Sequence, residues 1–161
     1  MDLSAANLTR IRQSAAAALQ ALPGSQVKFD VGEPQRVDSP NGSLAYWLVP
    51  GLLGEQIQAI TRILPGGSVA TVGLLKAPAT DCAQVATGLS APGAAELTNH
   101  LAQQYPGSQI SQPVLVHDGP VGREAWLYTV RSATGTALWI FATGGGIYSR
   151  SAGESLASNQ P

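Results

Sequence analysis

The chain has 161 residues, of which 44% are hydrophobic and only 12% are charged, whereas soluble domains carry about 25% charged residues. Its formal net charge is -1, so no basic field is available to attract nucleic acid or an anionic membrane surface. The high apolar fraction excludes disorder of the whole chain and is enough to build the core of one domain.

The first predicted element is an amphipathic helix from Ser4 to Leu22. Ser4 is a suitable N-cap, and Pro23-Gly24 is a strong stop signal. The residues at helical spacing that form its apolar stripe are Leu8, Ile11, Ala15, Leu19 and Leu22. Basic residues before an alanine-rich run are also typical of a signal peptide, but Asp2 and Gln20 do not fit that pattern. The sequence as it stands predicts a cytoplasmic protein, and an exported or lumenal mature domain whose signal peptide has been removed is the alternative.

Four strands are predicted in the first half of the chain. Val27–Val31 alternates apolar and polar residues, which is typical of a strand with one face in water. Leu44–Val49 is apolar on both faces, which indicates a central strand. Gln56–Leu64 and Val69–Leu75 flank the turn Pro65-Gly66-Gly67, and so short a link predicts an antiparallel hairpin.

Neither a membrane-spanning helix nor a disulfide is expected. The longest apolar run, Leu44–Leu53, is about half of the roughly 20 residues that a membrane helix needs. Cys82 is the only cysteine, so an intramolecular disulfide and a cysteine-rich zinc module are excluded. No basic residue lies beside Cys82 to lower the pKa of its thiol, which favours an inert, buried cysteine.

The middle of the chain, Lys76–Gly93, shows no sustained period. We predict an ordered but mobile loop there, with one helical turn at Cys82–Val85. A second helix follows, because Pro92 suits the first turn of a helix and Pro106-Gly107 ends the pattern. Its apolar stripe consists of Ala94, Leu97 and Leu101.

Four more strands are predicted in the second half: Ile110–His117, Arg123–Arg131, Thr136–Thr143 and Ile147–Arg150. Short turns join the strands and the helices lie outside the strand runs, which indicates an α+β fold. We expect an antiparallel sheet of about seven or eight strands, with the N-terminal and mid-chain helices packed on it. Residues 1–150 are predicted to form a single domain, followed by a flexible polar tail over 151–161.

Acidic and histidine side chains offer one candidate set for metal binding or acid–base chemistry: His100, His117, Asp118 and Glu124. Metal sites need three or four convergent ligands, and no HxH, HxxxH or CxxC spacing occurs, so neither a metal nor another cofactor is expected. His117 and Asp118 precede a turn, where Asp commonly caps the backbone; an acid–base site at His117 is the alternative. Gly144-Gly145-Gly146 leads into a strand instead of a helix, which predicts a hairpin turn and not a phosphate loop.

Aromatic residues are concentrated in the predicted strands. Members of a pair two residues apart, such as Trp126 with Tyr128 and Trp139 with Phe141, share a face. Core packing is the simplest explanation. The alternative is an incompletely covered sheet face that binds a partner or an apolar ligand, framed by Arg123 and Arg131 at the two ends of one strand. The candidate binding residues are Trp47, Arg123, Trp126, Tyr128 and Trp139.

Residues 69–150 resemble the PsbP-like fold family, which includes the photosystem II extrinsic subunit P and the LpqN-type lipoproteins. The resemblance lies in the order strand, loop, helix, strand and in two strand sequences, residues 121–130 (VGREAWLYTV) and residues 137–143 (ALWIFAT), followed by Gly145-Gly146-Ile147-Tyr148. Members of that family work mainly as noncatalytic accessory or binding subunits. The resemblance therefore implies a role in binding a partner.

Three functions remain open, and the absence of a catalytic constellation leans against an enzyme. The favoured one is a noncatalytic accessory protein that binds a protein partner through an aromatic, weakly charged sheet surface. The second is a pocket between helix and sheet for a small apolar ligand, with Lys76–Gly93 as its lid. The third is a small enzyme using His117 and Asp118. Apolar strands with few charges also favour a homodimer, because exposed flat edges otherwise aggregate.

Overall fold

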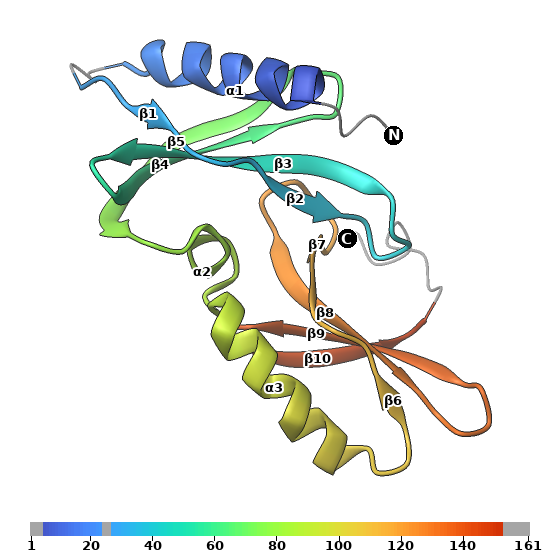
Figure 1. Cartoon of the computed structure of the whole chain (residues 1–161). Coiled ribbons are helices and arrows are strands. Elements are labelled where there is room, and N and C mark those ends of the chain that lie inside the picture. Colours follow the sequence, from blue (N-terminus) through green and yellow to red (C-terminus); the bar gives the residue numbers. More distant parts are fainter. Residues whose placement is uncertain (1–4, 24–26, 153–161) are drawn as a thin grey trace. The chain divides into compact units, whose positions relative to one another are not determined.

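The computed structural model describes residues 5–23 and 27–152 of the chain (Figure 1). The predicted helix start at Ser4 and residues 153–161 of the predicted tail lie outside these ranges. The chain divides into two compact units, one within residues 1–37 and 44–82 and the other within residues 38–43 and 83–161. A single domain over residues 1–150 therefore stays a prediction.

The first unit combines one helix with the first five strands. Its elements are α1 (Ala5–Gln20), β1 (Asp30–Val31), β2 (Gln35–Asp38), β3 (Leu44–Leu53), β4 (Gln56–Ile63) and β5 (Val69–Ala79). The long strands β3, β4 and β5 form an antiparallel meander, and β1 pairs with the end of β3. The last residue of β2, Asp38, belongs to the second unit.

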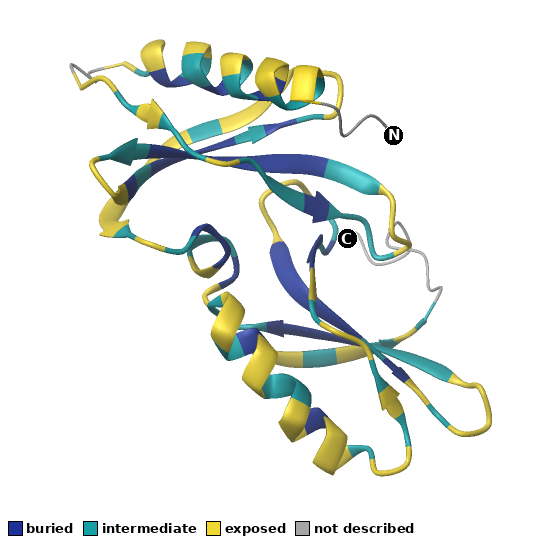
Figure 2. Ribbon diagram, viewed as in Figure 1, coloured by how far each residue is buried: buried dark blue, intermediate teal, exposed yellow. Residues whose placement is uncertain are grey.

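The predicted apolar stripe of the first helix forms the core of the first unit. Ile11 and Ala15 are fully buried against Trp47, Val49 and Ile63 of the sheet. The opposite side of α1 is exposed (Figure 2). Each buried Ile or Leu side chain contributes about 1.5–3 kcal/mol of hydrophobic free energy, so this one face is enough to hold the helix on the sheet.

The second unit holds two helices and the last five strands. Its elements are α2 (Cys82–Thr87), α3 (Ala91–Gln104), β6 (Gln109–Ile110), β7 (Val114–His117), β8 (Glu124–Arg131), β9 (Ala137–Thr143) and β10 (Gly146–Ser151). Cys82 at the start of α2 is the last residue of the first unit. The hydroxyl of Ser90 accepts a hydrogen bond from the Gly93 N–H at 3.1 Å and caps α3, and Pro92 lies in the first turn as predicted.

The α+β class, the two helices and a mostly antiparallel sheet are confirmed, but the described residues form ten strands instead of seven or eight. The strand β2 was missed because Val37 is its one apolar residue and prolines lie on both sides. Pro113 precedes a separate β7, so the predicted strand Ile110–His117 becomes two. The pairing of β2 with β7 is parallel, with Asp38 opposite Val116.

The predicted loop Lys76–Gly93 is largely regular structure. Its first residues continue β5 to Ala79, and α2 and the start of α3 occupy most of the remainder. The end of β5 shows no alternation of apolar and polar residues in the sequence. The reason is that β5 is exposed along nearly its whole length, so neither of its faces needs to be apolar. This segment therefore lacks the long irregular loop that the predicted lid requires.

The strand β5 forms the outer edge of the first unit's sheet. It pairs with β4, and Leu74 is 55% exposed. Between Val69 and Leu75 the strand carries neither a charge nor a proline. Its protective features, Lys76 and Pro78, come only at its end, so a neutral stretch of strand edge faces solvent.

Candidate functional site

The two faces of the second unit's sheet are covered differently. The indole N–H of Trp126 donates to the Leu89 carbonyl at 2.8 Å, and the hydroxyl of Tyr128 donates to the Ala94 carbonyl. These bonds place the even-numbered side of β8 against the segment that contains α3. Since side chains alternate along a strand, Thr129 and its odd-numbered neighbours lie on the other face. No helix among the described residues of the second unit packs there, and we call it the helix-free face.

Side chains on the helix-free face form rows that run across the strands. One row contains Val114, Leu127, Phe141 and Tyr148; the next contains Ser111, Thr129, Trp139 and Arg150. The Trp139 ring meets the Phe141 ring edge-on, with centroids 6.3 Å apart. Leu127 and Phe141 are buried, whereas Trp139 and Thr129 are half-buried. The face therefore becomes more exposed from the first row to the second.

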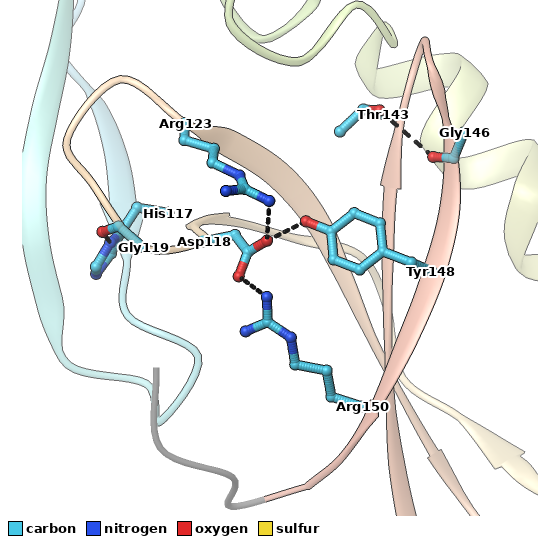
Figure 3. A network of polar contacts seen from close by, with 8 residues as sticks. All are labelled: His117, Asp118, Gly119, Arg123, Thr143, Gly146, Tyr148 and Arg150. Carbon is cyan, nitrogen blue, oxygen red and sulfur yellow. Dashed lines mark hydrogen bonds and ion pairs between the residues drawn. The ribbon is translucent and has the colours of Figure 1, made fainter. Parts of the chain in front are cut away.

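A buried carboxylate organises the β10 side of this face (Figure 3). The Asp118 side chain is completely buried and forms an ion pair with Arg150 at 2.8 Å. The Tyr148 hydroxyl donates a hydrogen bond to the other oxygen of Asp118, and the exposed Arg123 lies 3.6 Å from that oxygen. The guanidinium of Arg150 also stacks on Phe141, 5.2 Å from the ring centre. Two cations flank one buried anion. Because Arg150 and Tyr148 belong to β10, the network holds the turn before β8 against that strand.

Burial is the main cause that raises the pKa of the Tyr148 phenol to about 12. The hydrogen bond to Asp118 and the negative charge of Asp118 raise this pKa further, whereas Arg123 and Arg150 lower it. Burial alone raises the pKa of Tyr128 to about 12. Both phenols are therefore neutral donors at physiological pH.

His117 and Asp118 are neighbours in sequence but belong to separate networks. The imidazole of His117 points away from Asp118 (Figure 3), with Nδ1 2.7 Å from the Gly119 carbonyl oxygen and Nε2 3.1 Å from the Ser39 hydroxyl. A carbonyl only accepts hydrogen bonds, so Nδ1 carries the proton, and in the neutral ring Nε2 accepts from Ser39. A shared acid–base pair of His117 and Asp118 is therefore not formed.

The pairing of Ser39 with His117 resembles part of a nucleophile and base arrangement, but its surroundings do not support acyl transfer. Such a site needs free backbone N–H groups beside the serine to stabilise an oxyanion. Residue 40 is proline and has no N–H, and the Ser39 N–H already donates to the Ser43 carbonyl at 2.7 Å. The arrangement closes the turn before β3 and orients His117.

A second feature is a cleft of about 370 Å³ between α3 and the β9–β10 turn. Its apolar lining includes Leu89, Leu97 and Ile147, and Ile147 is 52% exposed. Glu96 and His100 also line it. The spacing of these two residues on α3 suits an ion pair, but the described structure shows no ion pair between Glu96 and His100.

Three of the five predicted binding residues belong to the core. Trp47 is 5% exposed under α1, Trp126 is 6% exposed, and Tyr128 is completely buried. Core packing explains these three, so they do not form the exposed aromatic surface expected from the sequence. Trp139 and Arg123 are accessible on the second unit, where they remain candidates for binding.

The sequence did not single out Gln109, Ser111 and Thr129 as site residues. Together with Ile110 and Arg131 they line a cleft of about 530 Å³ at the exposed end of the helix-free face. Thr129 lies directly opposite Trp139. Alternation along a strand puts Thr129 and Arg131 on one face, but the row that joins Ser111, Thr129 and Trp139 depends on strand register, which periodicity does not reveal.

The part of the chain that the structure describes contains no group of three or more His, Cys, Asp or Glu residues placed to hold a metal ion. Of the predicted set, His117 and Glu124 lie opposite each other in the β7–β8 ladder, while His100 is on α3. Cys82 is buried and is not part of a disulfide.

Comparisons with protein-family models, curated proteins and solved structures give no match to this chain. The resemblance to the PsbP-like family therefore stays a prediction. None of the helices within the described ranges is long and apolar enough to cross a membrane.

Proposed function

We propose that the protein is a noncatalytic accessory protein that binds a macromolecular partner through the helix-free face of its second unit. The observation that carries this proposal is the position of Trp139, which is half-buried on the sheet face opposite α3. Partly accessible tryptophans are enriched at the centres of protein interfaces. The separation of His117 from Asp118 supports a binding role over an enzymatic one.

The test is recovery of a partner from extracts of the source cells with immobilised protein. We expect Trp139→Ala to lower recovery of a specific partner at least tenfold, because the centre of an interface carries most of its binding energy. The matched control is Ile147→Ala, which removes another accessible apolar side chain from the α3 side of the sheet. Equal loss in both variants, or no specific partner with the wild type, contradicts the proposal.

A small apolar ligand in the cleft between α3 and the β9–β10 turn is the second candidate function. The cleft volume of about 370 Å³ lies in the range of ligand pockets, and Leu97 and Ile147 contribute apolar surface to it. Binding of a fluorescent apolar probe to the full chain tests this function. Ile147→Ser should then weaken probe binding while Trp139→Ala does not; the reverse result eliminates this candidate.

A further inference from the structure

The exposed end of the helix-free face has the properties of a site for an acidic peptide. Its cleft of about 530 Å³ is lined by Gln109, Ser111 and Thr129, which offer an amide and two hydroxyls, and by Arg131. The hydroxyl of Ser111 accepts a hydrogen bond from the Thr129 N–H at 2.8 Å, which leaves its own hydrogen free to donate. Hydrogen-bond donors therefore surround one cation, and no lining residue is acidic.

Arg131 differs from the other arginines near this face. Arg123 and Arg150 form ion pairs with Asp118, whereas Arg131 forms no ion pair with any residue in the described ranges 5–23 and 27–152. It is exposed at the end of β8. A guanidinium that forms no ion pair in the described part of the chain, and that lies beside hydroxyl and amide donors, is complementary to a carboxylate, which it binds in a bidentate geometry.

The distance between Arg131 and Trp139 indicates the kind of segment that fits. Arg131 lies opposite Ala137, and Thr129 lies opposite Trp139, so Arg131 and Trp139 are diagonal neighbours on one face. Diagonal neighbours on adjacent antiparallel strands are about 7–8 Å apart. In an extended peptide, side chains two residues apart lie on the same face about 6.6–6.8 Å apart. One extended segment can thus contact both residues.

We propose that this surface binds an extended acidic segment of a protein partner, with an Asp or Glu on Arg131 and an apolar side chain two residues away on Trp139. This inference rests on the proposed function, because it identifies the partner chemistry for the same face. The hydroxyls of Ser111 and Thr129 and the amide of Gln109 hold the carboxylate and the peptide backbone. Because Arg131 is positively charged and no residue that lines the cleft is acidic, an acidic segment is the complementary occupant.

Selection from a random-peptide display library on the immobilised full chain tests the inference. We expect enriched peptides with an acidic residue two positions from a large apolar one. A synthetic peptide of that sequence should bind Arg131→Glu at least tenfold more weakly than wild type. The matched control is Arg10→Glu, which makes the same charge change at an exposed position on α1 and should leave binding unchanged. Binding should also weaken as salt increases.

Several outcomes would overturn the inference, and they separate it from the proposed function. Peptides without acidic residues whose binding still requires Trp139 would overturn the acidic specificity alone. Peptides whose binding is independent of Trp139, or no enrichment at all, would count against both.

Discussion

Tyr148 donates its phenolic hydrogen to a carboxylate oxygen of Asp118, a side chain with no solvent exposure. The two residues are 30 positions apart in sequence, on β10 and in the turn that follows β7. Arg150 approaches the second oxygen of the same carboxylate. Asp118 is therefore the point at which the edge strand β10 is joined to the turn before β8.

Asp118→Asn should destabilise the protein by about 3 kcal/mol. The substitution leaves the largely buried Arg150 without its counter-charge, and breaking a buried pair costs about 3–5 kcal/mol. Urea unfolding measures this loss. Arg123→Gln is the control, because Arg123 is 63% exposed and surface pairs contribute about 0–1 kcal/mol. An equal loss of unfolding free energy in the two variants would show that burial does not determine how much these ion pairs contribute to stability.

Alkaline pH should destabilise the native state through Tyr128 and Tyr148. Their pKa values are raised to about 12 in the folded chain, against about 10 in an unfolded chain. Below about pH 10 both states keep the phenolic protons, so the stabilisation is complete; it is lost as pH rises to about 12. For the fully buried Tyr128 the two-unit shift corresponds to about 2–3 kcal/mol.

Tyrosinate absorbance during a pH titration checks this prediction directly. Tyr148→Phe and Tyr128→Phe should each remove one step of tyrosinate formation near pH 12. Asp118→Asn should move the Tyr148 step to lower pH, because the charge and hydrogen bond of Asp118 raise that pKa. A Tyr148 step unaffected by Asp118→Asn would show that burial alone sets the pKa.

Gly144→Ala should cost about 1–3 kcal/mol of stability, the usual cost of overpacking. A Cβ at residue 144 would lie 2.5 Å from the Gly88 carbonyl oxygen, and the Gly144 N–H donates to the Thr87 carbonyl at 2.9 Å. The obstacle is the backbone of Gly88, which cannot turn aside as a flexible side chain can. Gly145→Ala in the same turn is the control, because its Cβ would meet nothing closer than 3.7 Å. Equal thermal unfolding of the two variants would contradict this account.

Fluorescence quenching should distinguish the three tryptophans. Trp47 and Trp126 are 5% and 6% exposed, whereas Trp139 is half-buried beside cations. We expect iodide to quench Trp139 more strongly than caesium does, since the anion is attracted to Arg131 and Arg150. Trp139→Phe should remove most of the quenchable emission. Unchanged quenching in that variant would mean that Trp139 is not accessible.

Local signals in the sequence were sufficient for the helices and most strands, but not for the site. Ile11 and Ala15 follow helical spacing, and Pro65-Gly66-Gly67 is a turn on its own, so periodicity and turn chemistry located those elements. The row of Ser111, Thr129 and Trp139 depends on which strands pair and in what register. Burial of Trp47 likewise follows from α1 packing over it, and Trp126 donates to the Leu89 carbonyl in the segment before α3. Strand alternation specifies neither contact.

The exposed edge of β5 should make the protein a weak homodimer. Val72 and Leu74 share one face in the regular part of the strand, after a bulge at Ala70, and no charge lies between Val69 and Leu75. An antiparallel pair with a two-fold axis at Gly73 would place Val72 of one copy opposite Leu74 of the other, which extends the apolar row without opposing like charges. Leu74→Lys would oppose this pairing, whereas Ile147→Lys, at a similarly exposed position, would not. Sedimentation equilibrium should show a concentration-dependent dimer for the wild type and Ile147→Lys but monomer for Leu74→Lys; a wild type that stays monomeric at high concentration excludes the dimer.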